Sequence, residues 1–161
     1  MADEKVITLD NIDAFRDTTL QLAQQAQRQI VIFTPDLEPD LYSSDIFIDA
    51  LLKLIKRSRY TRIRILATET KYLTEQGHKI LTPLRRSDEQ LQIKKLGSNP
   101  ASSNTAYFIC DDHSIIRRQD ANVYRGFCYS NDRARVKDQL EDFDLQWNVA
   151  LADPNLRQLT L

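Results

Sequence analysis

The spacing of apolar residues changes repeatedly between the two-residue period of a strand and the period of about 3.6 residues of a helix. Short apolar or alternating runs predict strands at Lys5–Leu9, Ile30–Phe33, Arg62–Leu66, Leu91–Leu96, Tyr107–Cys110, Ser114–Arg117 and Val123–Tyr129. Apolar positions at helical spacing predict helices that begin near Asp10 or Asn11, at Ser43 to Asp45, at His78 and at Arg133. Strands that alternate with helices predict an α/β fold, a three-layer sandwich with a mixed, mostly parallel sheet flanked by helices.

The run Ile30–Phe33 is the clearest buried strand. Its residues are apolar without interruption, which is typical of a strand covered on both faces, and the run stops at Thr34 and Pro35. The helix that follows is strongly amphipathic, with an apolar face formed by Ile46, Phe47, Ala50, Leu51, Leu54 and Ile55. The last predicted helix, Arg133–Ala150, carries its apolar residues at Val136, Leu140, Phe143 and Trp147.

Composition supports one compact domain over residues 1–161. The chain has 161 residues and is 42% hydrophobic, which is sufficient for a sizeable core. No internal repeat is visible, and Gly97–Asn104 is the clearest cluster of turn-forming residues, predicted to be a flexible loop. With 22 basic and 23 acidic residues, no global field draws the chain to nucleic acid or membrane. Affinity for a polyanion must therefore come from a local patch.

The two cysteines, Cys110 and Cys128, lie in apolar surroundings. No signal peptide is recognisable, which favours buried, reduced thiols in a cytoplasmic protein, with a disulfide between them as the alternative. No apolar run approaches the roughly 20 residues that cross a bilayer, so we expect no membrane association.

The order of these segments resembles one repeat of the phospholipase D superfamily. In that family a strand runs into a Thr-Pro-like turn, and a helix then leads into a strand of the form Val-Arg-Ile-Leu; the stretch from Ile30 to Leu66 is similar throughout. A helix near the end of the family repeat carries Phe and Trp at the spacing of Phe143 and Trp147. The resemblance extends over most of the chain and implies half of a phospholipase-D-like sandwich.

The catalytic motif of that family, His-x-Lys-x4-Asp, is incomplete here. Asn104 and Ala106 stand at the histidine and lysine positions if Asp111 is the family aspartate, and Thr105 and Tyr107 stand there in the register shifted by one residue. The family histidine attacks phosphorus and the lysine offsets charge on the phosphoryl oxygens, and these side chains can do neither. We therefore expect no catalysis of the phospholipase D type.

The resemblance also indicates where a phosphate-bearing ligand would bind. The family's glycine-serine turn falls near Arg117 and Arg118, so long cations replace small residues beside the phosphate pocket. Arginines are typical of sites that hold phosphate groups. We predict a ligand-binding site from the residues that the resemblance assigns to this region: Thr34, Asn104, Asp111, His113, Arg117 and Arg118.

The only imidazoles in the sequence are His78 and His113. His113 follows two aspartates at a predicted tight turn, which we interpret as a hydrated hairpin tip; the alternatives are an imidazole–carboxylate pair or a weak metal site. His78 either faces a ligand or caps a helix. The acidic loop 36–40 is interpreted as solvated carboxylates rather than a cation site. No zinc-binding spacing is present, and we expect no metal and no cofactor.

Three functions remain open, in this order of preference. The first is a non-catalytic, degenerate phospholipase-D-like domain that binds a phosphate-bearing partner such as nucleic acid through Arg117 and Arg118. The second is a homodimeric interaction or assembly domain, because single-repeat members of the family resemble half an enzyme and pair two copies. The third is an unorthodox phosphodiesterase that uses His78 or His113.

Overall fold

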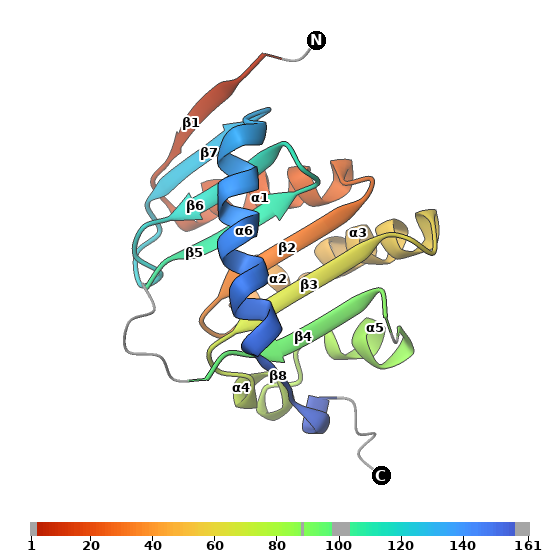
Figure 1. The fold of residues 1–161 in the computed structure, drawn as a ribbon. Coiled ribbons are helices and arrows are strands. Elements are labelled where there is room, and N and C mark those ends of the chain that lie inside the picture. The colour runs from red at the N-terminus through yellow and green to blue at the C-terminus, as the bar shows by residue number, and fades with distance from the viewer. Residues whose placement is uncertain (1–2, 88, 98–103, 157–161) are drawn as a thin grey trace.

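The computed structural model describes residues 3–87, 89–97 and 104–156. Within these residues the chain forms a single eight-stranded sheet with helices on both faces (Figure 1). The strands are β1 (Lys5–Leu9), β2 (Gln29–Thr34), β3 (Arg62–Ala67), β4 (Leu91–Lys95), β5 (Ala106–Cys110), β6 (Ser114–Arg118), β7 (Gly126–Ser130) and β8 (Leu151–Ala152). The helices are α1 (Ile12–Gln25), α2 (Pro39–Tyr42), α3 (Asp45–Arg57), α4 (Lys71–Glu75), α5 (Leu81–Arg86) and α6 (Arg133–Val149), followed by a 3-10 turn, Pro154–Leu156.

The sheet is mixed, as predicted, but the prediction that it is mostly parallel is wrong. The strand order is β1-β7-β6-β5-β2-β3-β4-β8, and in it only β2–β3 and β3–β4 are parallel pairs. Strands β5 and β6 are antiparallel because a tight turn joins them, in which Asp111 has a φ of 55°. A short connection of this kind can only join antiparallel neighbours, whereas the crossover helix α3 makes β2 and β3 parallel.

The two faces of the sheet have separate cores. On one face, Ile30 and Ile32 of β2 pack with apolar residues of α1 to α5. On the other face, Val31 and Phe33 pack against α6 alone, through Val136, Phe143 and Trp147. In Figure 1, α6 crosses in front of the sheet and α1 and α3 lie behind it. The uninterrupted apolar run of β2 is thus explained, because both of its faces are covered.

Polar side chains cap the N-terminal ends of the long helices. Asn11 accepts a hydrogen bond from the Ala14 amide at the start of α1, and Ser44 does the same for α3. Asp132 caps α6. Satisfying a free amide of the first turn stabilises each helix by about 1 kcal/mol, and it sets the residue at which the helix begins.

Some boundaries differ from the predictions. The strand predicted to begin at Val123 begins at Gly126. Val123 lies in the preceding turn, where its amide donates a hydrogen bond to the Asp120 carbonyl. The helix predicted from His78 begins at Leu81. The predicted loop Gly97–Asn104 lies mostly outside the described residues. Among the described helices, none has the length and apolar character needed to cross a membrane.

The two cysteines lie on the same face of the sheet but are not joined. Cys110 is on β5 and Cys128 is on β7, and β6 runs between these strands. Two strand spacings of roughly 4.8 Å each place the thiols beyond disulfide reach. Both side chains are buried and free, as the sequence favoured.

Candidate functional site

The residues predicted to form one site are divided between two ends of the sheet. Thr34 ends β2, Arg117 and Arg118 end β6, and Asn104 precedes β5, so these four lie at one end. Asp111 and His113 lie at the turn that joins the opposite ends of β5 and β6. The six residues therefore do not lie together, because the length of strand β5 separates the two groups.

Arg118 is not available to an external ligand. Its side chain is 3% exposed, and Nη2 donates to Glu38 Oε1 over 2.7 Å. Glu38 Oε2 accepts from the Tyr124 hydroxyl at 2.7 Å, and Oε1 also accepts from the Thr34 hydroxyl at 3.2 Å. The guanidinium lies over the Tyr124 ring, 4.7 Å from its centroid. Glu38 therefore takes the place that an anionic ligand would occupy on this arginine.

The surroundings of this ion pair leave little space and add negative charge. The cavity that Arg118 lines with Phe15, Tyr42 and Ala106 has a volume of about 10 Å³, which is at most enough for one water molecule. Burial, then the neighbouring Glu38 carboxylate, raises the pKa of Asp36, of Tyr42 and of Tyr124, the last to about 12. Tyr42 and Tyr124 are therefore neutral at physiological pH, and the site offers neither a nucleophile nor room for a phosphate.

Arg117 points to the opposite face of the sheet, beside α6. Consecutive residues of a strand alternate in direction, so Arg117 shares its face with Ile115 and not with Arg118. On this face Arg117 lies opposite Phe127 of β7, and Phe127 lies opposite Thr8 of β1. These side chains line a groove of about 470 Å³, hereafter the β6–β7 groove; its lining residues are Thr8, Arg117, Gln119, Asp120, Val123, Arg125, Gly126, Phe127 and Tyr129.

The lining of the β6–β7 groove contains two arginines and one carboxylate. Arg117 and Arg125 form no ion pair with any residue in the described part of the chain. Arg117 donates one hydrogen bond, from Nη1 to Gln119 Oε1 at 3.3 Å, and its buried Nε has no partner there. Asp120 is the carboxylate in the lining. Because its Oδ1 accepts from Asn104 and from the Asn122 amide, part of its charge is already engaged.

Asn104 supports the groove and does not face a ligand pocket. Its Nδ2 donates to Asp120 at 2.9 Å, and its carbonyl accepts from the Ala121 amide at 2.6 Å. These bonds hold the turn between β6 and β7 in place. Gly126 brings the two strands close together, because a Cβ at this position would lie 2.1 Å from the Arg117 carbonyl oxygen. Arg117 and Phe127 are thereby fixed side by side.

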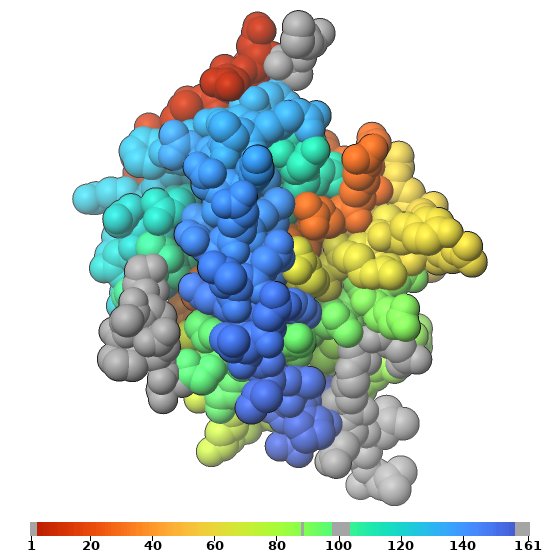
Figure 2. Space-filling view, viewed as in Figure 1, coloured from red at the N-terminus to blue at the C-terminus, as the bar shows by residue number. Residues whose placement is uncertain are grey.

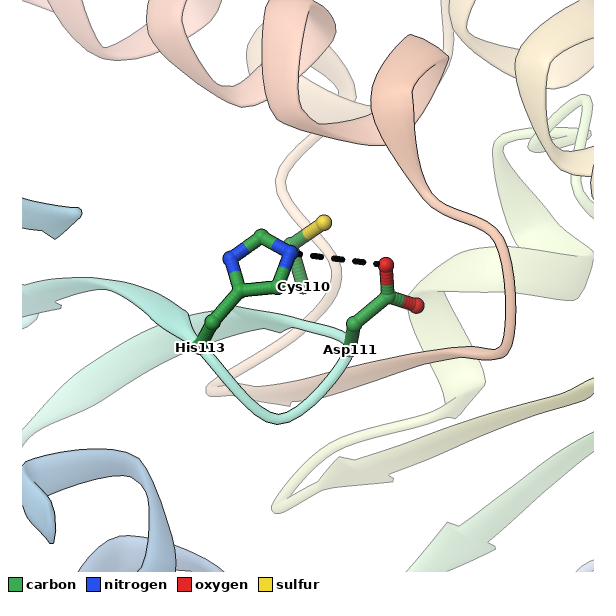
Figure 3. Close-up of side chains that lie close together, drawn as sticks. All are labelled: Cys110, Asp111 and His113. Atoms are coloured by element: carbon green, nitrogen blue, oxygen red, sulfur yellow. Dashed lines mark ion pairs between the residues drawn. The ribbon is translucent and has the colours of Figure 1, made fainter. Parts of the chain in front are cut away.

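Cys110, Asp111 and His113 meet at the other end of β5 (Figure 3), where their candidate ligand atoms all lie within 4.8 Å of one another. One of the alternatives considered for His113, a pair with an aspartate, is present, with His113 Nε2 3.6 Å from Asp111 Oδ2. The Asp111 carboxylate, however, accepts hydrogen bonds from three backbone amides, those of residues 27, 28 and 29.

The geometry of this cluster supports a structural role. Burial, followed by the charge of Asp111, raises the pKa of the Cys110 thiol, and this thiol donates to the Leu22 carbonyl at 3.3 Å. A protonated thiol and a carboxylate held by three amides are poor ligands for a metal. The cluster instead fastens the β5–β6 turn to the start of β2.

His78 has no free nitrogen for acid–base chemistry. The ring is 4% exposed, Nδ1 accepts from the Ile80 amide at 3.0 Å, and Nε2 therefore donates to the Leu37 carbonyl at 3.0 Å. Burial lowers its pKa to about 4, so the ring is neutral at physiological pH. The ring anchors the segment after β2, where Leu37 has a φ of 55°. The catalytic role considered for His78 is therefore not supported.

The residues of the two regions that sequence reasoning missed include Glu38, Arg125 and Phe127. Glu38 was interpreted as a solvated loop carboxylate, and nothing local to its sequence indicates a partner 80 residues away. Arg125 and Phe127 could have been found, because the alternation Arg125, Phe127, Tyr129 places a cation and two aromatic rings on one face of a strand.

Comparison with solved structures confirms the phospholipase-D-like fold. The phospholipase D family member Nuc from Salmonella typhimurium matches with a TM-score of 0.68 and 12% identity, over 94% of this chain and 99% of that chain. NucT from Helicobacter pylori matches with a TM-score of 0.63 and 10% identity, over 94% and 100%. TrmBL2, an archaeal chromatin protein with a novel mode of DNA binding, matches with a TM-score of 0.66 and 19% identity, over 92% and 54%.

The chain thus spans about half the length of TrmBL2. No curated protein is similar enough in sequence to match it. One family model matches residues 11–159, and the chain therefore belongs to the family described as domain of unknown function DUF7931.

Proposed function

We propose that this chain is a non-catalytic phospholipase-D-like domain that binds nucleic acid through the β6–β7 groove. The observation that carries the proposal is the pair Arg117 and Arg125, two arginines without an ion pair among the described residues, in a groove of about 470 Å³. Phosphate groups are bound by such cations, and the affinity they give needs no net positive charge on the whole chain.

Two further observations support this function over catalysis. Neither register of the degenerate motif retains the histidine and lysine of the family, so the nucleophile is missing from the sequence. The similar chain TrmBL2 is a DNA-binding chromatin protein, which gives a precedent for DNA binding by a protein that contains this fold. Of the six residues predicted from the sequence, this groove retains Arg117 in its lining, and Arg125 takes the place of Arg118 as the second cation.

The test is fluorescence anisotropy of labelled oligonucleotides, titrated with the purified protein at low and at physiological salt. We expect saturable binding that weakens with salt and is largely lost in the double variant Arg117→Ala, Arg125→Ala. The matched control is Lys56→Ala, Arg57→Ala, which removes the same charge from the exposed end of α3. Equal binding by the two double variants would contradict the proposed groove, and no binding by the native protein would contradict the function.

A homodimer is the second candidate, and the exposure of strand β1 favours it. Among the described strands, β1 has a neighbour on one side only, β7, and its Val6 and Ile7 are 62% and 50% exposed. An apolar edge strand can pair with a second copy of itself. Sedimentation equilibrium would show a dimer that Ile7→Lys converts to a monomer, whereas a native monomer at all concentrations would contradict this candidate.

A further inference from the structure

Aromatic side chains on one face of β7 follow a basic residue that directly precedes the strand. Arg125, Phe127 and Tyr129 are spaced by two residues, and Phe127 and Tyr129 both line the β6–β7 groove with Arg117. The two rings lie 5.9 Å apart, tilted by 42°. In Figures 1 and 2, α6 covers the middle of this face of the sheet. It leaves uncovered, on its left, the C-terminal end of β6 and the N-terminal end of β7.

The two rings differ in what covers them. The guanidinium of Arg135, on α6, lies over the Tyr129 ring at 3.9 Å from its centroid, so this ring already has a cation on one face. Phe127 has no such cover among the described residues, and 44% of it is exposed. Its neighbours across the sheet are Arg117 and Thr8. Phe127 is thus an exposed aromatic ring with a cation beside it.

An exposed phenylalanine between arginines matches the chemistry of one class of nucleic acid. A base that is not stacked in a duplex has a free π-face, which can lie on an aromatic side chain while nearby cations hold its phosphates. In a duplex the bases are stacked on one another and present only their edges, so Phe127 would gain nothing from contact with them. An isolated phosphate would use the arginines and leave the ring unused.

We propose that the β6–β7 groove binds single-stranded nucleic acid, with one base stacked on Phe127 and the adjoining phosphates held by Arg117 and Arg125. This inference rests on the proposed function and specifies its ligand. The interaction is independent of sequence, since every base has a π-face, and it requires no opening of the buried Glu38–Arg118 pair on the other face of the sheet.

The experiment compares a labelled single strand of mixed sequence with the same strand annealed to its complement, at fixed salt. The decisive variant is Phe127→Leu, which keeps an apolar side chain of similar size and removes the ring. The control is Tyr60→Leu, which removes an aromatic ring that is 70% exposed, has the Arg59 guanidinium 4.9 Å from its centroid and does not line the groove. Circular dichroism melts of both variants establish that they remain folded.

We expect the native protein to bind the single strand more tightly than the duplex, and Phe127→Leu to weaken single-strand binding about tenfold, as loss of one base–aromatic stack does. Tyr60→Leu should leave binding within about twofold. Equal binding of both ligands, or single-strand binding that Phe127→Leu does not weaken, would overturn this inference. If such binding were still lost in Arg117→Ala, Arg125→Ala, the proposed function would stand; no binding of either ligand would overturn both.

Discussion

Two adjacent arginines of one strand lie in different environments in this protein. Arg118 is buried with Glu38 on one face of the sheet, and Arg117 lines an open groove on the other. The sequence shows that the two point in opposite directions, because strands alternate. Which of them faces a carboxylate depends on Glu38, whose position is set by packing of a distant loop. The sequence could therefore locate the arginines but could not choose between them.

Removing the partner of the buried arginine should be costly. Glu38→Ala leaves Arg118 and the Tyr124 hydroxyl without their acceptor in a closed space, and loss of one partner of a buried pair costs about 3–5 kcal/mol. Urea denaturation measures this loss. The control is Lys79→Ala, which breaks the exposed Lys79–Asp45 pair and should cost about 1 kcal/mol or less. Similar losses in the two variants would show that the Glu38 carboxylate is not buried as described.

The buried imidazole predicts a defined pH dependence. The ordinary pKa of His78 is 6.5 and its folded value is about 4, so the unfolded chain takes up a proton as pH falls through 6.5 while the folded chain stays neutral. The stability that depends on neutral His78 is therefore complete above pH 6.5 and is lost as pH falls toward 4. Its size is on the order of 3 kcal/mol.

Urea denaturation at pH 7.5 and pH 4.5 tests this dependence, with the same series on His78→Gln as the control for other titrating groups. The free energy of unfolding should fall more steeply in the native protein than in the variant. Parallel pH profiles would contradict a buried neutral His78.

At the scale of elements, local pattern and long-range pairing differ in how far they can be predicted. The helix α3 follows directly from the amphipathic spacing after Ser43, whereas its cap, Ser44, was one of three candidates between Ser43 and Asp45. Whether β5 pairs parallel or antiparallel with β2 does not follow from either strand, since both read as buried apolar runs. The start of β7 was not predicted correctly. The turn before this strand is held by Asp120, which bonds to Asn104 on the other side of β5 and β6, and this contact is not visible in the sequence.

Helix α6 is the one described helix that covers its face of the sheet, and its attachment rests on few residues. Phe143 is fully buried and stacked on Trp147, and the Arg64 guanidinium lies 5.0 Å from the centroid of its ring. Phe143→Ala should therefore cost about 3–5 kcal/mol. Leu145 of the same helix is 70% exposed, so Leu145→Ala should change the free energy of unfolding by no more than about 0.5 kcal/mol.

The single tryptophan of the chain, Trp147, reports this transition by fluorescence during urea denaturation. Equal stability of the Phe143→Ala and Leu145→Ala variants would show that α6 does not pack on the sheet through Phe143.

At the scale of the whole molecule, the placement of charge matters more than its sum. The net charge is −1, yet the β6–β7 groove has two arginines that no described carboxylate pairs with. The phospholipase-D-like order of elements was predictable from the sequence. Which of the two arginines lacks an ion pair was not, because it required knowing that Glu38 pairs with Arg118.

Salt dependence measures how many of these cations contact phosphate. Each phosphate contact on a single strand contributes a slope of about −0.7 to log K against log salt, so two arginines predict roughly −1.4. Anisotropy titrations over a salt series give this slope for the native protein. It should approach zero in Arg117→Ala, Arg125→Ala and stay unchanged in Lys56→Ala, Arg57→Ala. A slope of the native size in the first variant would place the phosphate contacts elsewhere.

The central claim is that the ligand binds on the α6 face, away from the closed pocket of Arg118. A ¹H–¹⁵N NMR titration of the native protein with a short single-stranded oligonucleotide tests it most directly. We predict that the amide shifts of residues 117, 119, 125 and 127 move with added ligand, while those of Glu38 and Leu37 remain in place. Shifts concentrated at Glu38 and Leu37, or at the β5–β6 turn, would contradict the account.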